Sequence, residues 1–112
     1  MPKPPHRAYS RYSTEALGLL AEMIRAGRIR RKITGQEMAT RAGISRSLLQ
    51  RIEKGDPGCA IGAVFEVAAI AGVPLFEANR EGLEARRAVT GEVLSLLPKA
   101  ARRLRRVVKD DF

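Results

Sequence analysis

The sequence predicts an all-α protein, with a small helical domain over residues 13–79 and a C-terminal extension over residues 80–112 that is helical or disordered. Apolar residues recur along most of the chain at the three- and four-residue spacing of helices. Ser, Thr and Gly stand where such helices would begin and end. Hydrophobic residues make up 45% of the chain but aromatic residues only 4%, so the core must be aliphatic. The 112 residues suffice for one compact domain with appendages.

The central stretch, residues 34–55, predicts two short helices joined by a tight turn. Thr34 is followed three residues later by Glu37, the spacing of a capping box that starts a helix. Gly43 is expected to close this helix, because glycine adopts the left-handed conformation without a Cβ clash. Ser45 then caps the second helix.

The second helix is expected to have one buried and one wet face. Leu48, Leu49 and Ile52 fall on one side at helical spacing and should enter the core. The opposite side carries residues long or polar enough to reach base edges and phosphates: Arg46, Ser47, Gln50, Arg51 and Lys54.

A first helix is expected from a cap at Ser13 to about Lys32, with Glu15 in its first turn, where a negative charge suits the helix dipole. Its apolar face comprises Leu17, Leu20, Ala21, Ile24 and the stem of Arg28. Its basic C-terminal half is either a solvated face or a set of phosphate contacts; it comprises Arg25, Arg28, Arg30, Arg31 and Lys32.

Two further helices are expected after the central stretch. Cys59 and Ile61 should point into the core from the connecting turn. Residues 62–71 form an apolar helix closed by Gly72, and a short fifth helix begins at Pro74. Leu75 and Phe76 in that helix are expected to cover the core.

The central stretch resembles the helix-turn-helix of the XRE, or lambda-repressor-like, DNA-binding family. The matching residues are Thr34, Glu37, Ala39, Gly43, Ile44, Ser45, Ile52, Glu53 and Gly55. The resemblance implies a five-helix domain that binds double-stranded operator DNA, with the second of the paired helices in the major groove. The alternative is a helical hairpin that does not touch DNA.

The same resemblance implies the DNA-binding residues, which are Gln36, Ser45, Arg46, Ser47, Gln50, Arg51 and Lys54. Of these, Arg46, Ser47 and Arg51 align with the main base-contact positions of the family, and Gln50 borders them. The family often places Gln directly after the capping Thr, where it braces the reading helix and touches a phosphate. Here Gly35 stands at that position and Gln36 follows.

Charge suggests a polyanionic partner, with nucleic acid ahead of an acidic protein or a membrane surface. The formal net charge is +9. Residues 1–33 carry eight Lys/Arg against two Glu, or +6; residues 34–76 carry four against four, or zero; residues 77–112 carry nine against six, or +3. Non-specific attraction is therefore expected from the flanks and discrimination from the second helix of the pair.

Catalytic, cofactor and metal sites have little support in the sequence. His6 is the single histidine and lies in residues 1–12, a Pro-rich basic arm expected to be disordered and either untethered or laid along DNA. Cys59 is the single cysteine, has no patterned base and forms no internal disulfide, as in a reducing compartment. Because no signal peptide or membrane span is found, a cytoplasmic protein without membrane contact is expected.

The last third of the chain points to a partner. A helix over residues 77–89 has too few apolar residues to be stable alone and is expected to pack against another chain. An apolar cluster at residues 93–97 follows, broken by Pro98, and then a basic tail that is otherwise read as a disordered polyelectrolyte.

Three segments together, GISRSLLQRIEKGDP, AIGAVFEVAAIAGVPLF and the LLPK…RR…KDDF tail, are similar to HipB-type antitoxins. This similarity implies a homodimer that binds a HipA-type serine/threonine kinase toxin and represses its own operon on the bacterial nucleoid. The alternative is a stand-alone XRE-family regulator, prophage or housekeeping, with no toxin partner.

Overall fold

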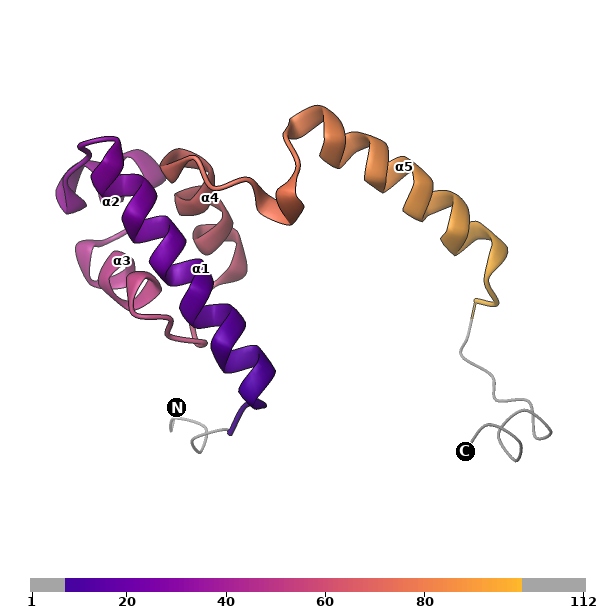
Figure 1. The fold of residues 1–112 in the computed structure, drawn as a ribbon, viewed down its shortest axis with the longest axis horizontal. Coiled ribbons are helices and arrows are strands. Elements are labelled where there is room, and N and C mark those ends of the chain that lie inside the picture. Colours follow the sequence, from indigo (N-terminus) through magenta and orange to yellow (C-terminus); the bar gives the residue numbers. More distant parts are fainter. Residues whose placement is uncertain (1–7, 100–112) are drawn as a thin grey trace. The chain divides into compact units, whose positions relative to one another are not determined.

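The computed structural model describes residues 8–99, and within them every regular element is helical (Figure 1). The all-α prediction is therefore confirmed for this part of the chain. The predictions on residues 1–7 and on the tail from residue 100 lie outside the described residues. The chain divides into two units, one ending at Glu77 and one beginning at Ala78. The elements are α1 (Arg11–Arg30), α2 (Gly35–Ala42), α3 (Arg46–Glu53), α4 (Ile61–Ala71), the 3-10 turn η1 (Leu75–Glu77) and α5 (Arg80–Leu96).

Helix α1 begins and ends earlier than predicted. Ser10, not Ser13, is the N-cap, and its Oγ accepts a hydrogen bond from the backbone N–H of Ser13 at 3.2 Å. Since a hydroxyl at either serine satisfies a free N–H three residues ahead, the earlier cap adds a turn to the helix. The helix ends at Arg30, and Lys32 takes a left-handed conformation with φ 58°. This turn directs Ile33 into the core, where it is 7% exposed.

The capping box and the turn between α2 and α3 are confirmed. The N–H of Glu37 donates to Oγ1 of Thr34 at 3.0 Å, and the N–H of Thr34 donates to Oε1 of Glu37 at 3.1 Å. Gly43, with φ 69°, closes α2 in the left-handed conformation. The N–H of Leu48 then donates to Oγ of Ser45 at 3.0 Å and fixes the start of α3.

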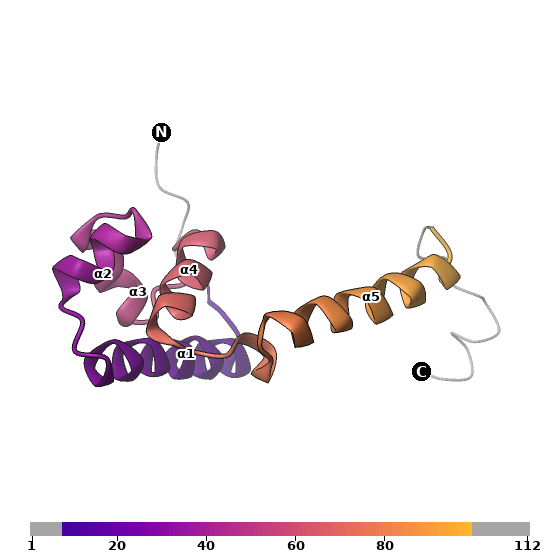
Figure 2. The same ribbon diagram turned by 90° about the horizontal axis from the view of Figure 1, so that it is seen from above.

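The core of the first unit lies where α2, α3 and α4 cover one side of α1 (Figure 2). Ile24, Met38 and Val67 are its largest fully buried side chains. Gly27 of α1 is buried against α4, and a Cβ there would collide with the backbone carbonyl of Ala71. Because glycine has no Cβ, this position lets α1 and α4 approach each other closely.

The predictions that Ile61 and Phe76 enter or cover the core are wrong. Ile61 is 70% exposed, because it stands at the first position of α4, outside the face through which that helix enters the core. The short fifth helix is present as the 3-10 helix η1, in which Phe76 has φ 55°. Leu75 packs on the core, but Phe76 is exposed and meets the ring of Phe65 edge-on at a centroid distance of 6.5 Å. Cys59 does pack on the core as predicted.

The second unit contains α5, which is longer than predicted. Oδ1 of Asn79 accepts a hydrogen bond from the N–H of Gly82 at 2.8 Å, and the helix continues past Val89 to Leu96. Gly91 does not end it, since an interior glycine costs a helix only about 1 kcal/mol. None of the residues of α5 is buried, so the apolar cluster at residues 93–97 lies exposed at its C-terminal end.

Candidate nucleic-acid interface

Helix α3 has the two faces that the sequence predicts. Leu49 and Ile52 are buried, and Leu48 is half-buried against the core. The predicted polar row is exposed in full; its members are Arg46, Ser47, Gln50, Arg51 and Lys54. Because the core anchors one side of a capped helix, the other side is held as a rigid surface.

Ser45 and Gln36 differ from this row in what their side chains do. The hydroxyl oxygen of Ser45 accepts the capping hydrogen bond of α3, so this residue sets where the helix begins. Gln36 is exposed on α2, and its Nε2 donates to Oγ1 of Thr40 on the same helix at 3.3 Å. The hydrogen bonds of the described residues therefore do not join Gln36 to α3.

Arg51 is tied to the loop after α3. Its Nε lies 2.8 Å from Oδ2 of Asp56, whose Oδ1 accepts a hydrogen bond from the N–H of Gly58 at 2.7 Å. The hydrogen bond to Asp56 raises the pKa of Arg51 above its usual value. The guanidinium faces solvent with part of its charge already compensated, a pairing that the sequence reasoning did not anticipate.

A second ion pair joins α1 to the end of α3. Nε and Nη2 of Arg28 lie 2.7 and 3.0 Å from the two carboxylate oxygens of Glu53, and Nη1 donates to the carbonyl of Ile33 at 3.0 Å. The hydrogen bonds that Arg28 donates to Glu53 raise the pKa of Arg28, against the opposing effect of burial. Arg28 therefore joins α1 to the C-terminal end of α3, and its guanidinium is not available as a free phosphate ligand. This ion pair could have been predicted from the sequence, because Arg28 lies on the apolar face of the first helix and Glu53 directly follows the buried Ile52.

The basic half of α1 consequently divides into two groups. Arg28 is held by Glu53, and Nη1 of Arg31 donates to the carbonyl of Ile70 on α4 at 2.8 Å. The side chains of the remaining three cations make no hydrogen bond or ion pair among residues 8–99; they are Arg25, Arg30 and Lys32.

A cleft of about 400 Å³ brings part of this group next to α3. Four cations and one carboxylate line it, together with one amide; the residues are Arg25, Arg28, Arg46, Gln50, Glu53 and Lys54. The structure thus gathers three of the predicted site residues at one place, whereas Ser47 and Arg51 do not line the cleft. The sequence placed Arg25 among five basic residues that were either solvated or phosphate contacts, and the structure places Arg25 in this cleft.

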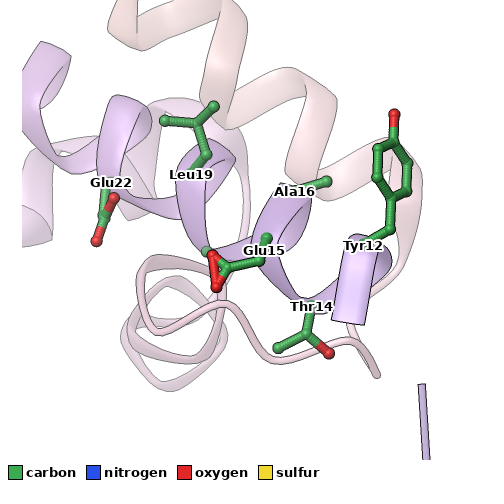
Figure 3. Close-up of a pocket in the computed structure, with 7 residues that line it drawn as sticks. Tyr12, Thr14, Glu15, Ala16, Leu19 and Glu22 are labelled. Atoms are coloured by element: carbon green, nitrogen blue, oxygen red, sulfur yellow. The ribbon is translucent and has the colours of Figure 1, made fainter. Parts of the chain in front are cut away.

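Another hollow, on the outer side of α1, has different chemistry (Figure 3). Tyr12, Ala16 and Leu19 contribute its apolar surface, and Glu15 and Glu22 supply carboxylates. Two carboxylates repel a phosphate backbone, so this hollow is not a nucleic-acid site.

Over residues 8–99, no three His, Cys, Asp or Glu side chains are grouped so as to hold a metal ion. The helices of this part are too short or too polar to cross a membrane. Burial raises the pKa of the Cys59 thiol, which lowers its thiolate fraction and hence its reactivity.

Comparison with known proteins agrees with this geometry. A family model described as a helix-turn-helix domain matches residues 19–83, more than half of the chain. The matched range contains α2, the turn at Gly43 and α3. No curated protein matches the chain.

Proposed function

Because the chain belongs to the helix-turn-helix domain family, we propose that it is a transcriptional regulator that reads double-stranded DNA by placing α3 in the major groove. The observation that carries this proposal is the row of exposed polar side chains on a helix whose opposite face is locked into the core. The proposed DNA-contacting set comprises Gln36, Ser45, Arg46, Ser47, Gln50, Arg51 and Lys54. Among these, Gln50 suits the paired donor and acceptor of adenine, and a serine hydroxyl suits several bases.

The regulator is proposed to act as a homodimer on a palindromic operator, with half-sites about 34 Å or a multiple apart. Support comes from α5, which buries none of its residues within its own chain and exposes Val89, Val93 and Leu96. Most of the stability of a helix in a protein comes from the packing of its apolar face, and a second copy of the chain would supply that packing for α5. The proposed location is the bacterial cytoplasm, on the nucleoid.

The finer part of the proposal is that the protein is a HipB-type antitoxin, which binds a HipA-type serine/threonine kinase toxin and represses its own operon. Two features support it: the three sequence segments similar to such antitoxins, and the exposed apolar cluster at the C-terminal end of α5. The alternative is a stand-alone XRE-family regulator without a toxin.

Sequence-specific DNA binding is tested by selecting duplexes that bind the protein. The full chain is incubated with a pool of duplexes of random sequence, and bound duplexes are amplified over several rounds. One sequence should be enriched, and Ser47→Ala should weaken its binding by about 1–3 kcal/mol while leaving a scrambled duplex unaffected. Ser95→Ala, an exposed serine of α5, is the matched control and should change neither. Absence of any enriched sequence with the wild-type chain would refute the proposal.

The antitoxin part needs its own experiment. The chain is purified under mild conditions from its native host, and the proteins that accompany it are identified by mass spectrometry. A kinase of the HipA type in stoichiometric amount is the expected result. Recovery of the chain with operator DNA but without a kinase would favour the stand-alone regulator.

A further inference from the structure

The first residue of α2, Gly35, leaves a shelf that the side chain of Arg46 occupies. A Cβ built on Gly35 would lie 3.3 Å from both Cζ and Nε of Arg46 and 3.4 Å from its Nη2. Three guanidinium atoms at nearly equal distances mean that the planar group lies flat over the position where another residue would have its side chain. Arg46, the first residue of α3, is thus turned towards α2 instead of straight out from its helix.

The same side chain lines the cleft between α1 and α3, where it faces Arg25 and Lys54. The side chains of these three cations form no hydrogen bond or ion pair within the described part of the chain. Arg28 and Glu53, also in the cleft wall, compensate each other. The cleft therefore holds three positive charges without a counter-charge, at the edge of the proposed reading helix, and this favours an anion.

We infer that this cleft is a binding site for one backbone phosphate of DNA, formed by Arg25, Arg46 and Lys54, and that Arg46 contacts the phosphate instead of a base edge. The inference rests on the proposed function and deepens it. It gives α1 a direct contact with DNA, and it leaves Ser47, Gln50 and Arg51 on α3 as the residues that contact base edges. Gly35 becomes the positioning residue, because its missing side chain lets Arg46 reach the cleft. This assignment differs from the base contact that the family resemblance implies for Arg46.

A phosphate contact and a base contact respond differently to salt and to sequence. Binding of the selected duplex and of a scrambled duplex is measured by fluorescence anisotropy from 50 to 200 mM KCl. Arg46→Ala should weaken both duplexes by the same factor and lower the slope of log K against log salt by about 0.9. Its affinity should consequently fall by roughly 3.5-fold less than that of the wild type across this salt range.

Arg25→Ala should behave in the same way, since its charge is assigned to the same phosphate. Arg46→Lys should keep most of the affinity, because a phosphate accepts a point charge whereas a bidentate contact with guanine needs the guanidinium fork. Arg41→Ala, an exposed arginine of α2 outside the cleft, is the control for general loss of charge and should leave the slope nearly unchanged.

The positioning role is tested with Gly35→Leu, whose side chain occupies the shelf; Ala alone would displace the guanidinium by only a few tenths of an ångström. This variant should reproduce the salt response of Arg46→Ala without a loss of thermal stability. Gly62→Leu is the matched control, since Gly62 lies in the first turn of α4 and a Cβ there meets nothing within 4 Å.

A loss confined to the selected duplex, with an unchanged salt slope for Arg46→Ala, would overturn the inference and leave the proposed function standing. A normal salt slope for Arg25→Ala would likewise remove α1 from the site. If the wild-type chain bound neither duplex, the proposed function itself would fail. The wild-type measurement therefore distinguishes failure of the proposed function from failure of the inference.

Discussion

The ion pair between Arg28 and Glu53 offers the sharpest test of how the reading helix is held. Glu53→Gln keeps the shape of the side chain but removes its charge, so Arg28 is left half-buried with only the carbonyl of Ile33 as a strong acceptor. Removing one partner of a fully buried pair costs about 3–5 kcal/mol. Here the side chains of Arg28 and Glu53 are 16% and 11% exposed, and water partly screens the orphaned charge.

We therefore expect Glu53→Gln to lower the free energy of unfolding by about 2 kcal/mol, which corresponds to a fall in Tm of roughly 8–16 °C for a domain of this size. The measurement is urea and thermal unfolding followed by circular dichroism at 222 nm. The matched control is Arg51→Gln, which breaks an ion pair whose side chains are 48% and 36% exposed and should cost clearly less, because water screens an exposed pair.

A double-mutant cycle separates the pair from its surroundings. Combining Glu53→Gln with Arg28→Gln should cost clearly less than the sum of the single changes, because neither member of the half-buried pair is then left charged without the other. Equal costs for Glu53→Gln and Arg51→Gln, or additive costs in the cycle, would refute the argument that α1 fixes α3 through this pair.

Three further predictions concern the close contact of α1 with α4, the capping box and the surface of α5. Gly27→Ala should destabilise the domain by about 1–3 kcal/mol because its Cβ meets the carbonyl of Ala71, whereas Gly18→Ala, which meets nothing within 4 Å, should stabilise it by about 0.5–1 kcal/mol; urea unfolding compares the two. The hydrogen bond from the backbone N–H of Thr34 lowers the pKa of Glu37 most, and the hydrogen bond with the Thr34 side chain lowers it further. Its contribution to stability is therefore present above the unfolded pKa of about 4.3 and lost as pH falls through the lower folded pKa, so the stability difference between the wild type and Glu37→Gln should shrink below about pH 5. Val93→Asp places a charge on the exposed apolar face of α5 and should shift a dimer to monomer in light scattering at micromolar concentration; an unchanged mass would exclude this face from the dimer contact.

The parts of the fold that were predictable depend on residues close together in the chain. The capping box of Thr34 and Glu37 spans three residues, and the left-handed closure at Gly43 is a property of one. The choice between Ser10 and Ser13 was not predictable in the same way, because both offer a hydroxyl at a suitable distance from a free N–H. Nor did local pattern place the end of α5, since an interior glycine weakens a helix without ending it.

The candidate site shows the same division. The exposed row on α3 followed from helical spacing, because Leu49 and Ile52 had to enter a core and the intervening residues then faced solvent. Which of those residues share a cleft did not follow from spacing. Arg46 lies against Gly35, and Arg25 faces the same opening from α1, and no periodicity links these positions.

By itself, the amino-acid sequence determined the helical class, the helix-turn-helix and the side of α3 that meets water, since these arise within a few turns of one chain segment. Only the tertiary structure decided which cations in and next to α1 and α3 are bonded to groups on other helices and which have no such bond within residues 8–99. Arg28 and Glu53 are 25 residues apart in the chain, and Arg31 reaches a carbonyl 39 residues away. A charge becomes free or compensated only when packing sets its neighbours, so that distinction is a property of the folded domain.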